Sequence, residues 1–217
     1  MKKLLFILAL VMVVTPGWAH TISYQLDKVS QGQVFLDYLL IGFEHIIPAG
    51  FDHILFIVCL FFLSKDLKTI IFQASMFTVA HSITLGLAMN GIIKPPPAIV
   101  EPLIALSIVL LAVENILTNK LRSWRMAMIF LFGMVHGMGF AGALAELGIP
   151  RYAFASALIS FNVGVELGQL AIILALYFLI ARTVSDKSWY RKGVIVPINI
   201  LIAIFASYLT VERIFFQ

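Results

Sequence analysis

Charged residues are scarce in this chain of 217 residues, where they account for 12% of positions against 61% for hydrophobic ones. Water-soluble globular proteins carry about 25% charged residues, so the composition excludes that class and indicates a polytopic membrane protein. Cysteine is almost missing too. The single Cys59 can form neither an internal disulfide nor a cysteine-based zinc site, so any bound metal must rely on His, Asp, Glu and Asn.

Lysine and arginine are missing from the interiors of the long apolar runs. Although the formal net charge is +4, the basic residues fall in short connecting segments, which indicates membrane topology and argues against a nucleic-acid partner. If the processed N-terminus is periplasmic, nine basic residues lie on the cytoplasmic side and four on the other. This is the positive-inside bias of a chain with six spans in the lipid bilayer and both ends periplasmic. The nine are Lys65, Lys68, Lys120, Arg122, Arg125, Arg182, Lys187, Arg191 and Lys192, and the four are Lys28, Lys94, Arg151 and Arg213.

The N-terminus has the features of a cleaved signal peptide. Two lysines precede an apolar run of about eleven residues, and small residues follow up to Ala19. An uncleaved membrane helix is the alternative, although that run is short for a span. Cleavage after Ala19 would expose His20, whose amine and imidazole could together chelate a metal such as copper. We therefore predict a signal peptide over 1–19 and a short periplasmic segment over 20–33.

The remaining residues, 34–217, are predicted to form an all-α membrane domain, a bundle of about six transmembrane helices. Each apolar run approaches or exceeds the ~20 residues that cross a bilayer, and Gly, Pro and Asn separate the runs. The first run is about thirty residues long, more than one span needs, so we expect Pro48 and Gly50 to break it around 48–50. The six runs cover 34–63, 67–89, 98–117, 126–147, 152–181 and 194–211.

Titratable side chains interrupt these runs at similar depths. At a rise of ~1.5 Å per residue, Asp52, His53, His81, His136 and Glu166 lie about 15–22 Å from the predicted cytoplasmic ends of their helices. Such groups are costly at membrane depth and mark functional sites. Because no basic residue is expected inside the membrane to neutralise the acids, we expect a bound metal ion or a mobile proton to do so.

Polar residues recur every three or four positions in two runs, which predicts stripes that face the bundle interior. Gly133 and Gly137 flank His136, and their spacing lets a neighbouring helix approach closely. Hydrogen bonding between helices, with no ligand, is the alternative reading of the stripes. The stripes consist of Ser75, Thr78, His81 and Ser82 in one run, and of Asn162, Glu166 and Gln169 in the other.

Two further candidates, Glu44 and His45, lie nearer the predicted outer mouth. We expect them to feed or gate a site rather than to form its centre. Because Pro48 breaks the helix, spacing alone does not decide whether His45 and His53 share a face. Weaker candidates near the ends of their helices are Glu101, Glu114 and Glu146.

Five stretches resemble the HupE/UreJ family. They are GFEHIIPAGFDHILF at 42–56, FTVAHSITL at 77–85, VEPLIALSI at 100–108, FGMVHGMGFA at 132–141 and FNVGVELGQ at 161–169. The family comprises bacterial inner-membrane proteins associated with nickel or cobalt uptake for hydrogenase and urease. The resemblance implies a metal permease whose histidine–aspartate–histidine signature is His45, Asp52 and His53. In its nickel permeases Pro directly follows the first His and the spacing is one residue shorter, so this chain resembles a divergent branch.

The leading hypothesis is a permease for a divalent transition metal, since imidazole with carboxylate and amide oxygen suits Ni, Co, Zn or Mn. Two alternatives stay open. One is an accessory protein for metal delivery or metalloenzyme maturation, and the other is an intramembrane zinc enzyme with a Glu as general base. A homo-oligomer or a maturation partner is compatible with each. The predicted ligands are Asp52, His53, His81 and His136, with Asn162 and Glu166 as further ligands or as groups that orient them, and Glu44 and His45 at the mouth.

Overall fold

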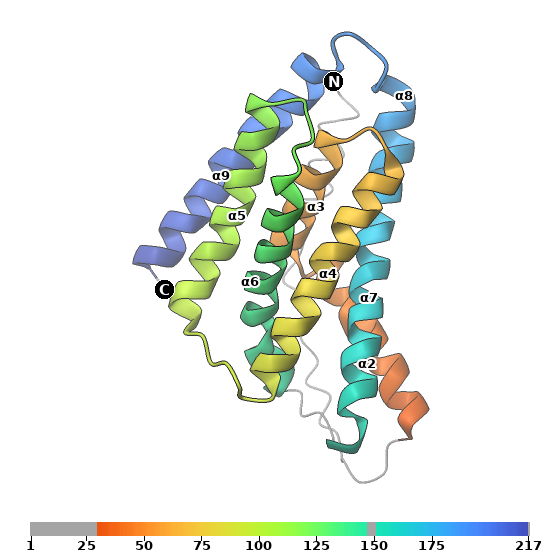
Figure 1. The fold of residues 1–217 in the computed structure, drawn as a ribbon, viewed down its shortest axis with the longest axis vertical. Coiled ribbons are helices and arrows are strands. Elements are labelled where there is room, and N and C mark those ends of the chain that lie inside the picture. Colours follow the sequence, from red (N-terminus) through yellow and green to blue (C-terminus); the bar gives the residue numbers. More distant parts are fainter. Residues whose placement is uncertain (1–29, 147–150, 217) are drawn as a thin grey trace.

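The computed structural model of the protein describes residues 30–146 and 151–216, and all regular structure in these ranges is helical (Figure 1). The all-α bundle predicted from the sequence is confirmed. The predicted signal peptide and His20 lie outside the described residues. The helices are α2 (Gln31–Ile46), α3 (Phe51–Leu63), α4 (Leu67–Met89), α5 (Pro97–Leu117), α6 (Trp124–Glu146), α7 (Phe154–Leu176), α8 (Arg182–Val184) and α9 (Val196–Phe215), with a 3-10 turn at Arg151–Ala153 and π-helical turns at Tyr177–Ala181 and Arg191–Ile195.

Most of these helices are long enough to cross a membrane. Within the described residues, five are long and apolar enough to do so alone, the span at Phe154–Val184 including α7 and α8. The pair α2 and α3 meets at an angle of 69° and passes the same test as one bent span, which would make six. The bend falls between Ile46 and Phe51, and Pro48 and Gly50 lie inside it.

Local chemistry determines where α4 begins. The carboxylate of Asp66 caps the helix by accepting hydrogen bonds from the backbone N–H groups of Lys68 (3.4 Å) and Thr69 (3.1 Å) and from the Thr69 hydroxyl (2.6 Å). These bonds, above all that from the Thr69 hydroxyl, favour the ionised form and lower the pKa of Asp66 below its usual value. The cap ends the short connection from α3, so α3 and α4 run in opposite directions (Figure 1).

Three helix pairs build the bundle: α4 packs along α6, α2 along α7, and α5 along α9. Between them lies α3, which contacts α4, α5 and α7 (Figure 1). Beyond Asp52 and His53 the sequence of α3 is apolar on every side, as expected of a helix surrounded by other helices. The central position of α3 carries these two polar residues into the bundle.

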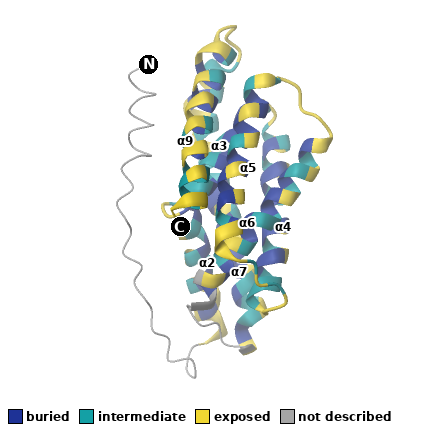
Figure 2. Cartoon of the chain, turned by 90° about the vertical axis from the view of Figure 1, so that its left-hand side faces the viewer, coloured by how far each residue is buried: buried dark blue, intermediate teal, exposed yellow. Residues whose placement is uncertain are grey.

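The outer surface of the bundle is apolar. Exposed residues cover the loops and the outward faces of the helices, whereas the faces toward the axis are buried (Figure 2). Large hydrophobic side chains such as Phe72 (58% exposed) and Ile204 (64% exposed) lie on that outer surface. This distribution suits a lipid environment, because a soluble protein rarely exposes apolar patches of this extent.

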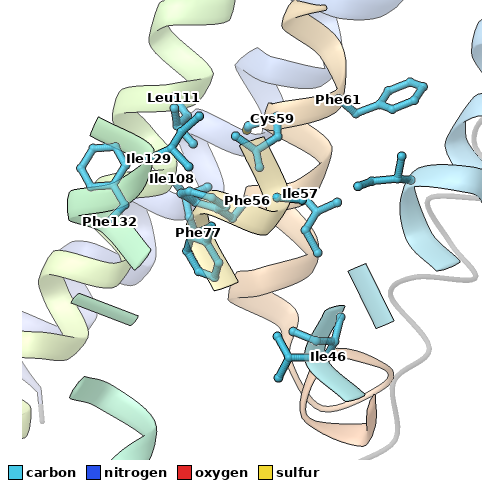
Figure 3. Close-up of a cluster of buried hydrophobic side chains, with 14 of the residues drawn as sticks. Ile46, Phe56, Ile57, Cys59, Phe61, Phe77, Ile108, Leu111, Ile129 and Phe132 are labelled. Carbon is cyan, nitrogen blue, oxygen red and sulfur yellow. The ribbon is translucent and has the colours of Figure 1, made fainter. Parts of the chain in front are cut away.

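The hydrophobic core surrounds α3. Phe56 of α3 lies close to Phe77 of α4 and Ile108 of α5, and Ile57 belongs to the same buried cluster (Figure 3). Phe56 stacks at 4.7 Å between ring centroids against Phe77, in a tilted arrangement. The core thus lies directly beside the polar residues at the start of α3.

Glycines allow the paired helices to approach closely. A Cβ atom on Gly133 would lie 2.5 Å from the carbonyl oxygen of Phe77, and one on Gly137 would collide with the carbonyl oxygen of His81. The close approach that the sequence predicted beside His136 is confirmed, and α4 is the neighbouring helix. The α2–α7 pair is built alike, because a Cβ atom on Gly42 would collide with the carbonyl oxygen of Phe161.

A buried arginine corrects one expectation. Arg125, counted in the sequence as a residue of a cytoplasmic loop, lies in the first turn of α6 and is fully buried. Its guanidinium forms an ion pair with Glu114 of α5 and donates to the side-chain oxygen of Gln73 (3.2 Å) and the carbonyl oxygen of Cys59 (3.4 Å). A cation therefore balances Glu114, an acid that the sequence placed near the end of its helix.

The first prediction concerns the α4–α6 contact. Gly137→Ala should destabilise the protein by about 1–3 kcal/mol, because overpacking forces the helices apart. Gly142→Ala on the same helix is the matched control, since a Cβ atom there meets nothing within 4 Å, and it should be neutral or slightly stabilising. Thermal unfolding in detergent measures both variants, and equal melting temperatures would contradict the close contact.

The second prediction concerns the buried ion pair. Arg125→Leu leaves the Glu114 carboxylate buried without its cation and should cost about 3–5 kcal/mol. The double variant Arg125→Leu/Glu114→Leu removes both charges and should recover most of that loss. Thermal unfolding again reports the result. A double variant that melts as low as the single one would show that the unpaired carboxylate of Glu114 does not cause the loss of stability.

Candidate metal centre

Three histidines from three helices meet inside the bundle. His45 is near the end of α2, His53 is in the first turn of α3, and His81 lies in α4. One ring nitrogen from each lies within 4.8 Å of the others. His81 is fully buried and His53 is 7% exposed. Such a group can hold a metal ion between them.

The break in the first span brings His45 and His53 together. Helix α2 ends at Ile46, and the chain turns through Pro48 and Gly50 before α3 begins. A Cβ atom on Gly50 would collide with the carbonyl oxygen of His45, so the tight turn requires glycine there. The two imidazole rings lie 4.6 Å apart between centroids. His45, expected nearer the mouth, therefore lies within the cluster.

A fourth histidine borders this group. The ring of His136 in α6 lies 5.0 Å from that of His53 between centroids. Its Nδ1 is 2.9 Å from the carbonyl oxygen of Phe132. Since a carbonyl oxygen can only accept, Nδ1 carries the hydrogen and Nε2 keeps a free lone pair. The close α4–α6 contact thus brings a metal-binding nitrogen to the cluster.

Several imidazole nitrogens in this region are buried without a hydrogen-bond partner among the described residues. Buried polar atoms are nearly always paired, so this many unpaired nitrogens at one place indicate a site for a ligand that accepts their lone pairs. They are Nε2 of His45, His53 and His136, and both ring nitrogens of His81.

Aromatic rings enclose the histidines. Phe140 packs against His45 at 3.8 Å between centroids. Phe161 stacks on Phe140 at 5.3 Å and on His81 at 6.4 Å. An apolar wall keeps bulk water from the imidazoles and strengthens any electrostatic interaction inside the cluster.

The acid of the motif has a cationic partner. Arg213 of α9 donates from Nη2 to Oδ2 of Asp52 at 2.8 Å and from Nη1 to the backbone oxygen of Glu101 at 3.1 Å. The expectation that no cation is available is therefore wrong at Asp52. Oδ1 of Asp52 is buried and unpaired among the described residues. Arginine and aspartate are partly buried, with side chains 15% and 21% exposed.

A cavity of about 420 Å³ leads to the cluster. Its walls include the Asp52–Arg213 pair, Glu101 and the histidines His45, His53 and His136. The ion pair thus lies in the same cavity as the histidines. The positive charge of Arg213 would repel a cation that occupied this cavity and would compete with it for Asp52.

The remaining candidates are Asn162, at the edge of the histidine cluster, and two glutamates outside it. Asn162 of α7 lies beside His81, and its side-chain oxygen is buried and unpaired among the described residues. Glu166 accepts hydrogen bonds from Ser75 and Thr78 of α4. Glu44 is exposed on α2. The structure thus brings together the four histidines and leaves the carboxylates around them.

The sequence contains no signal that Arg213 contacts Asp52. Arg213 lies at the end of the last apolar run, where a basic residue ordinarily marks the membrane boundary. No local pattern relates it to Asp52, which is 161 positions earlier in the chain. Only the packing of α9 along α5 shows that the two side chains meet.

Comparison with known proteins identifies the family. A family profile described as HupE / UreJ protein matches residues 20–213. The chain belongs to the HupE/UreJ family. Members of the HupE/UreJ family are linked to nickel or cobalt transport or to urease and hydrogenase maturation. Searches of curated proteins and of solved structures each returned no match.

The HupE/UreJ match covers the candidate site as a whole. It includes the four clustered histidines, and it ends at Arg213, the partner of Asp52. The handling of metals in this family agrees with a group of buried nitrogen donors.

The third prediction tests the charge at this site. Arg213→Gln should raise the affinity for Ni²⁺, used as a probe, about tenfold or more, because a nearby positive charge is removed and Asp52 is released. Arg213→Lys is the matched control and should stay near wild type, since it keeps the charge. Calorimetric titration of the purified protein measures all three. Equal affinities for all of them would show that Arg213 does not compete with the metal.

Proposed function

We propose that the protein is an inner-membrane permease for a divalent transition-metal cation of the nickel or cobalt type. The observation that carries the proposal is the group of His45, His53 and His81, whose ring nitrogens lie within 4.8 Å of one another. Membership of the HupE/UreJ family supports it. The metal is the transported substrate in this proposal and not a resident cofactor.

The donor set favours first-row transition metals. Neutral imidazole suits Ni, Co and Zn, whereas Mg²⁺ and Ca²⁺ prefer oxygen. His136 supplies a fourth nitrogen, and Asp52 supplies negative charge once Arg213 moves away from it. Asn162 serves to orient His81. Glu166 stands outside this ligand set, because both of its oxygens accept hydrogen bonds from hydroxyl groups.

The charged residues of the cavity, Arg213 and Asp52, define the route that we propose for the ion. The ion would enter the cavity, displace the guanidinium of Arg213 and pass from the oxygen of Asp52 to the imidazoles of His53 and His136. Return of Arg213 to Asp52 would then favour release, since the arginine replaces the ion as the partner of the acid. A permease needs such a competitor, because a site that binds too tightly does not let go.

We propose the topology that follows from the positive-inside rule. The loops after α3, α5 and α8, together with the adjoining ends of the helices, carry most of the basic residues, and these loops lie at one end of the bundle (Figure 1). With this end in the cytoplasm, both termini of the mature chain are periplasmic. The proposed organisation is a signal peptide at 1–19, a periplasmic segment at 20–33 and a six-span domain at 34–217.

A second candidate is an accessory role in metal delivery or metalloenzyme maturation, which the family's link to urease and hydrogenase maturation favours. In this role the same histidines would bind the metal and pass it to a partner protein. Binding and transport measurements on one preparation separate the two functions.

The fourth prediction tests metal binding and transport. Purified wild-type protein should bind one Ni²⁺, Co²⁺ or Zn²⁺ in calorimetric titration, and His53→Ala and His81→Ala should each weaken binding by about 100-fold or more, since loss of a group that only supports a ligand already costs 10–100-fold. Reconstituted wild-type protein should carry the ion into liposomes, and both variants should fail.

The same binding and transport assays include a control, and two results would contradict the proposal. Asp186→Asn replaces an exposed carboxylate that pairs with Lys65 and should leave binding intact. Binding without uptake into liposomes would reject the permease and favour the accessory role. Wild-type affinity in folded His53→Ala and His81→Ala would reject the metal site itself.

A further inference from the structure

A second polar site lies between α4 and α7. The Ser75 hydroxyl donates to Oε1 of Glu166 at 2.5 Å, and the Thr78 hydroxyl donates to Oε2 at 2.6 Å. These residues line a groove of about 510 Å³ together with Asn162 and Ser82. Apolar side chains such as Val79 (53% exposed) form the rest of its walls.

Within the described residues, no cationic side chain forms an ion pair with Glu166. Asp52, by contrast, lies against Arg213 and Glu114 against Arg125. Glu166 lies twelve residues after the start of α7 at Phe154, about 18 Å along the helix. A lone carboxylate at that depth is costly unless a cation or a proton joins it.

Thr78 has more hydrogen-bond acceptors around its hydroxyl than it can serve. Its Oγ1 is within reach of three acceptors, the carbonyl oxygen of Ala74 (3.2 Å), Oε2 of Glu166 (2.6 Å) and Oε1 of Gln169 (3.2 Å). A hydroxyl carries one hydrogen and serves one of these at a time. Oxygen atoms thus outnumber the hydrogens available to them.

We propose that Glu166, Ser75, Thr78 and Gln169 bind a small monovalent cation, Na⁺ or a proton, at a site distinct from the imidazole cluster. Carboxylate, hydroxyl and amide oxygens are hard donors that suit such a cation. The imidazoles, which suit transition metals, are segregated from them. The bound charge neutralises Glu166 in the apolar groove and completes the deficient hydrogen bonding at Thr78.

Glu166 is the acidic residue of the proposed cation site. The helices packed against α7 carry His45 on α2, His53 on α3 and His81 on α4, and all three belong to the imidazole cluster. The site itself needs no metal. Its role as the driving ion of transport rests on the proposed permease function, because an ion bound beside the metal route can couple to it.

The fifth prediction uses a fluorescent carbodiimide, which reacts with a protonated carboxyl group in apolar surroundings. Full-length protein in Na⁺-free detergent solution should be labelled at Glu166, as identified by mass spectrometry of the peptides. If the ligand is Na⁺, then Na⁺ at about ten times its dissociation constant should slow labelling about tenfold by mass action, and K⁺ should not. If it is a proton, labelling should ignore Na⁺ and fall as the pH rises.

Matched variants make the test specific. Glu166→Gln should abolish this labelling, and Ser75→Ala/Thr78→Val should weaken protection by Na⁺ or shift the pH profile. Glu44→Gln, at an exposed acid of α2, should change neither. Failure of Glu166 to react at every pH at which the protein stays folded would overturn the site. Ni²⁺ binding by Glu166→Gln, expected to be unchanged, reports separately on the imidazole cluster, so failure of the permease proposal would not imitate failure of this one.

Discussion

The turn between α2 and α3 is the constraint on which the candidate metal centre depends. A straight helix of this length would carry His45 and His53 more than two turns apart, on positions that no single ion could bridge. The turn lets α2 end and α3 begin at the same place in the bundle, with Gly50 tight against the backbone of His45. Exposed backbone at membrane depth is tolerated where it borders a cavity, and the turn borders one.

Close contacts between helices bring the other histidines to the cluster. Gly133 and Gly137 let α6 lie against α4, which places His136 near the histidines of α3 and α4. Gly42 lets α2 lie against Phe161 of α7. A β-carbon at these positions would collide with the backbone of the neighbouring helix and push the helices apart. The close packing of the helices therefore determines whether a metal site can form, because nitrogen donors from four helices must lie within a few ångströms of one another.

Electrostatics divides the interior into three parts. Arg125 balances Glu114, Arg213 balances Asp52, and Glu166 relies on hydroxyl groups. The first pair is fully enclosed and structural in character. The second borders a cavity, where a metal cation can compete for the acid. The third leaves a negative charge that a mobile cation or proton would neutralise, consistent with two different ligands held by two different sets of donor atoms.

The sequence by itself determined the bundle, its approximate spans, the break at Pro48 and Gly50, and the identity of the histidines, because hydropathy and helical period are local properties. The glycine spacing beside His136 also followed from the sequence. Only the tertiary structure decided that His45 lies in the cluster, that Arg213 holds Asp52, and that Glu166 lies with Ser75 and Thr78. Helical period states which residues share a face, but the angle at a break and the pairing of distant helices depend on packing across the whole bundle.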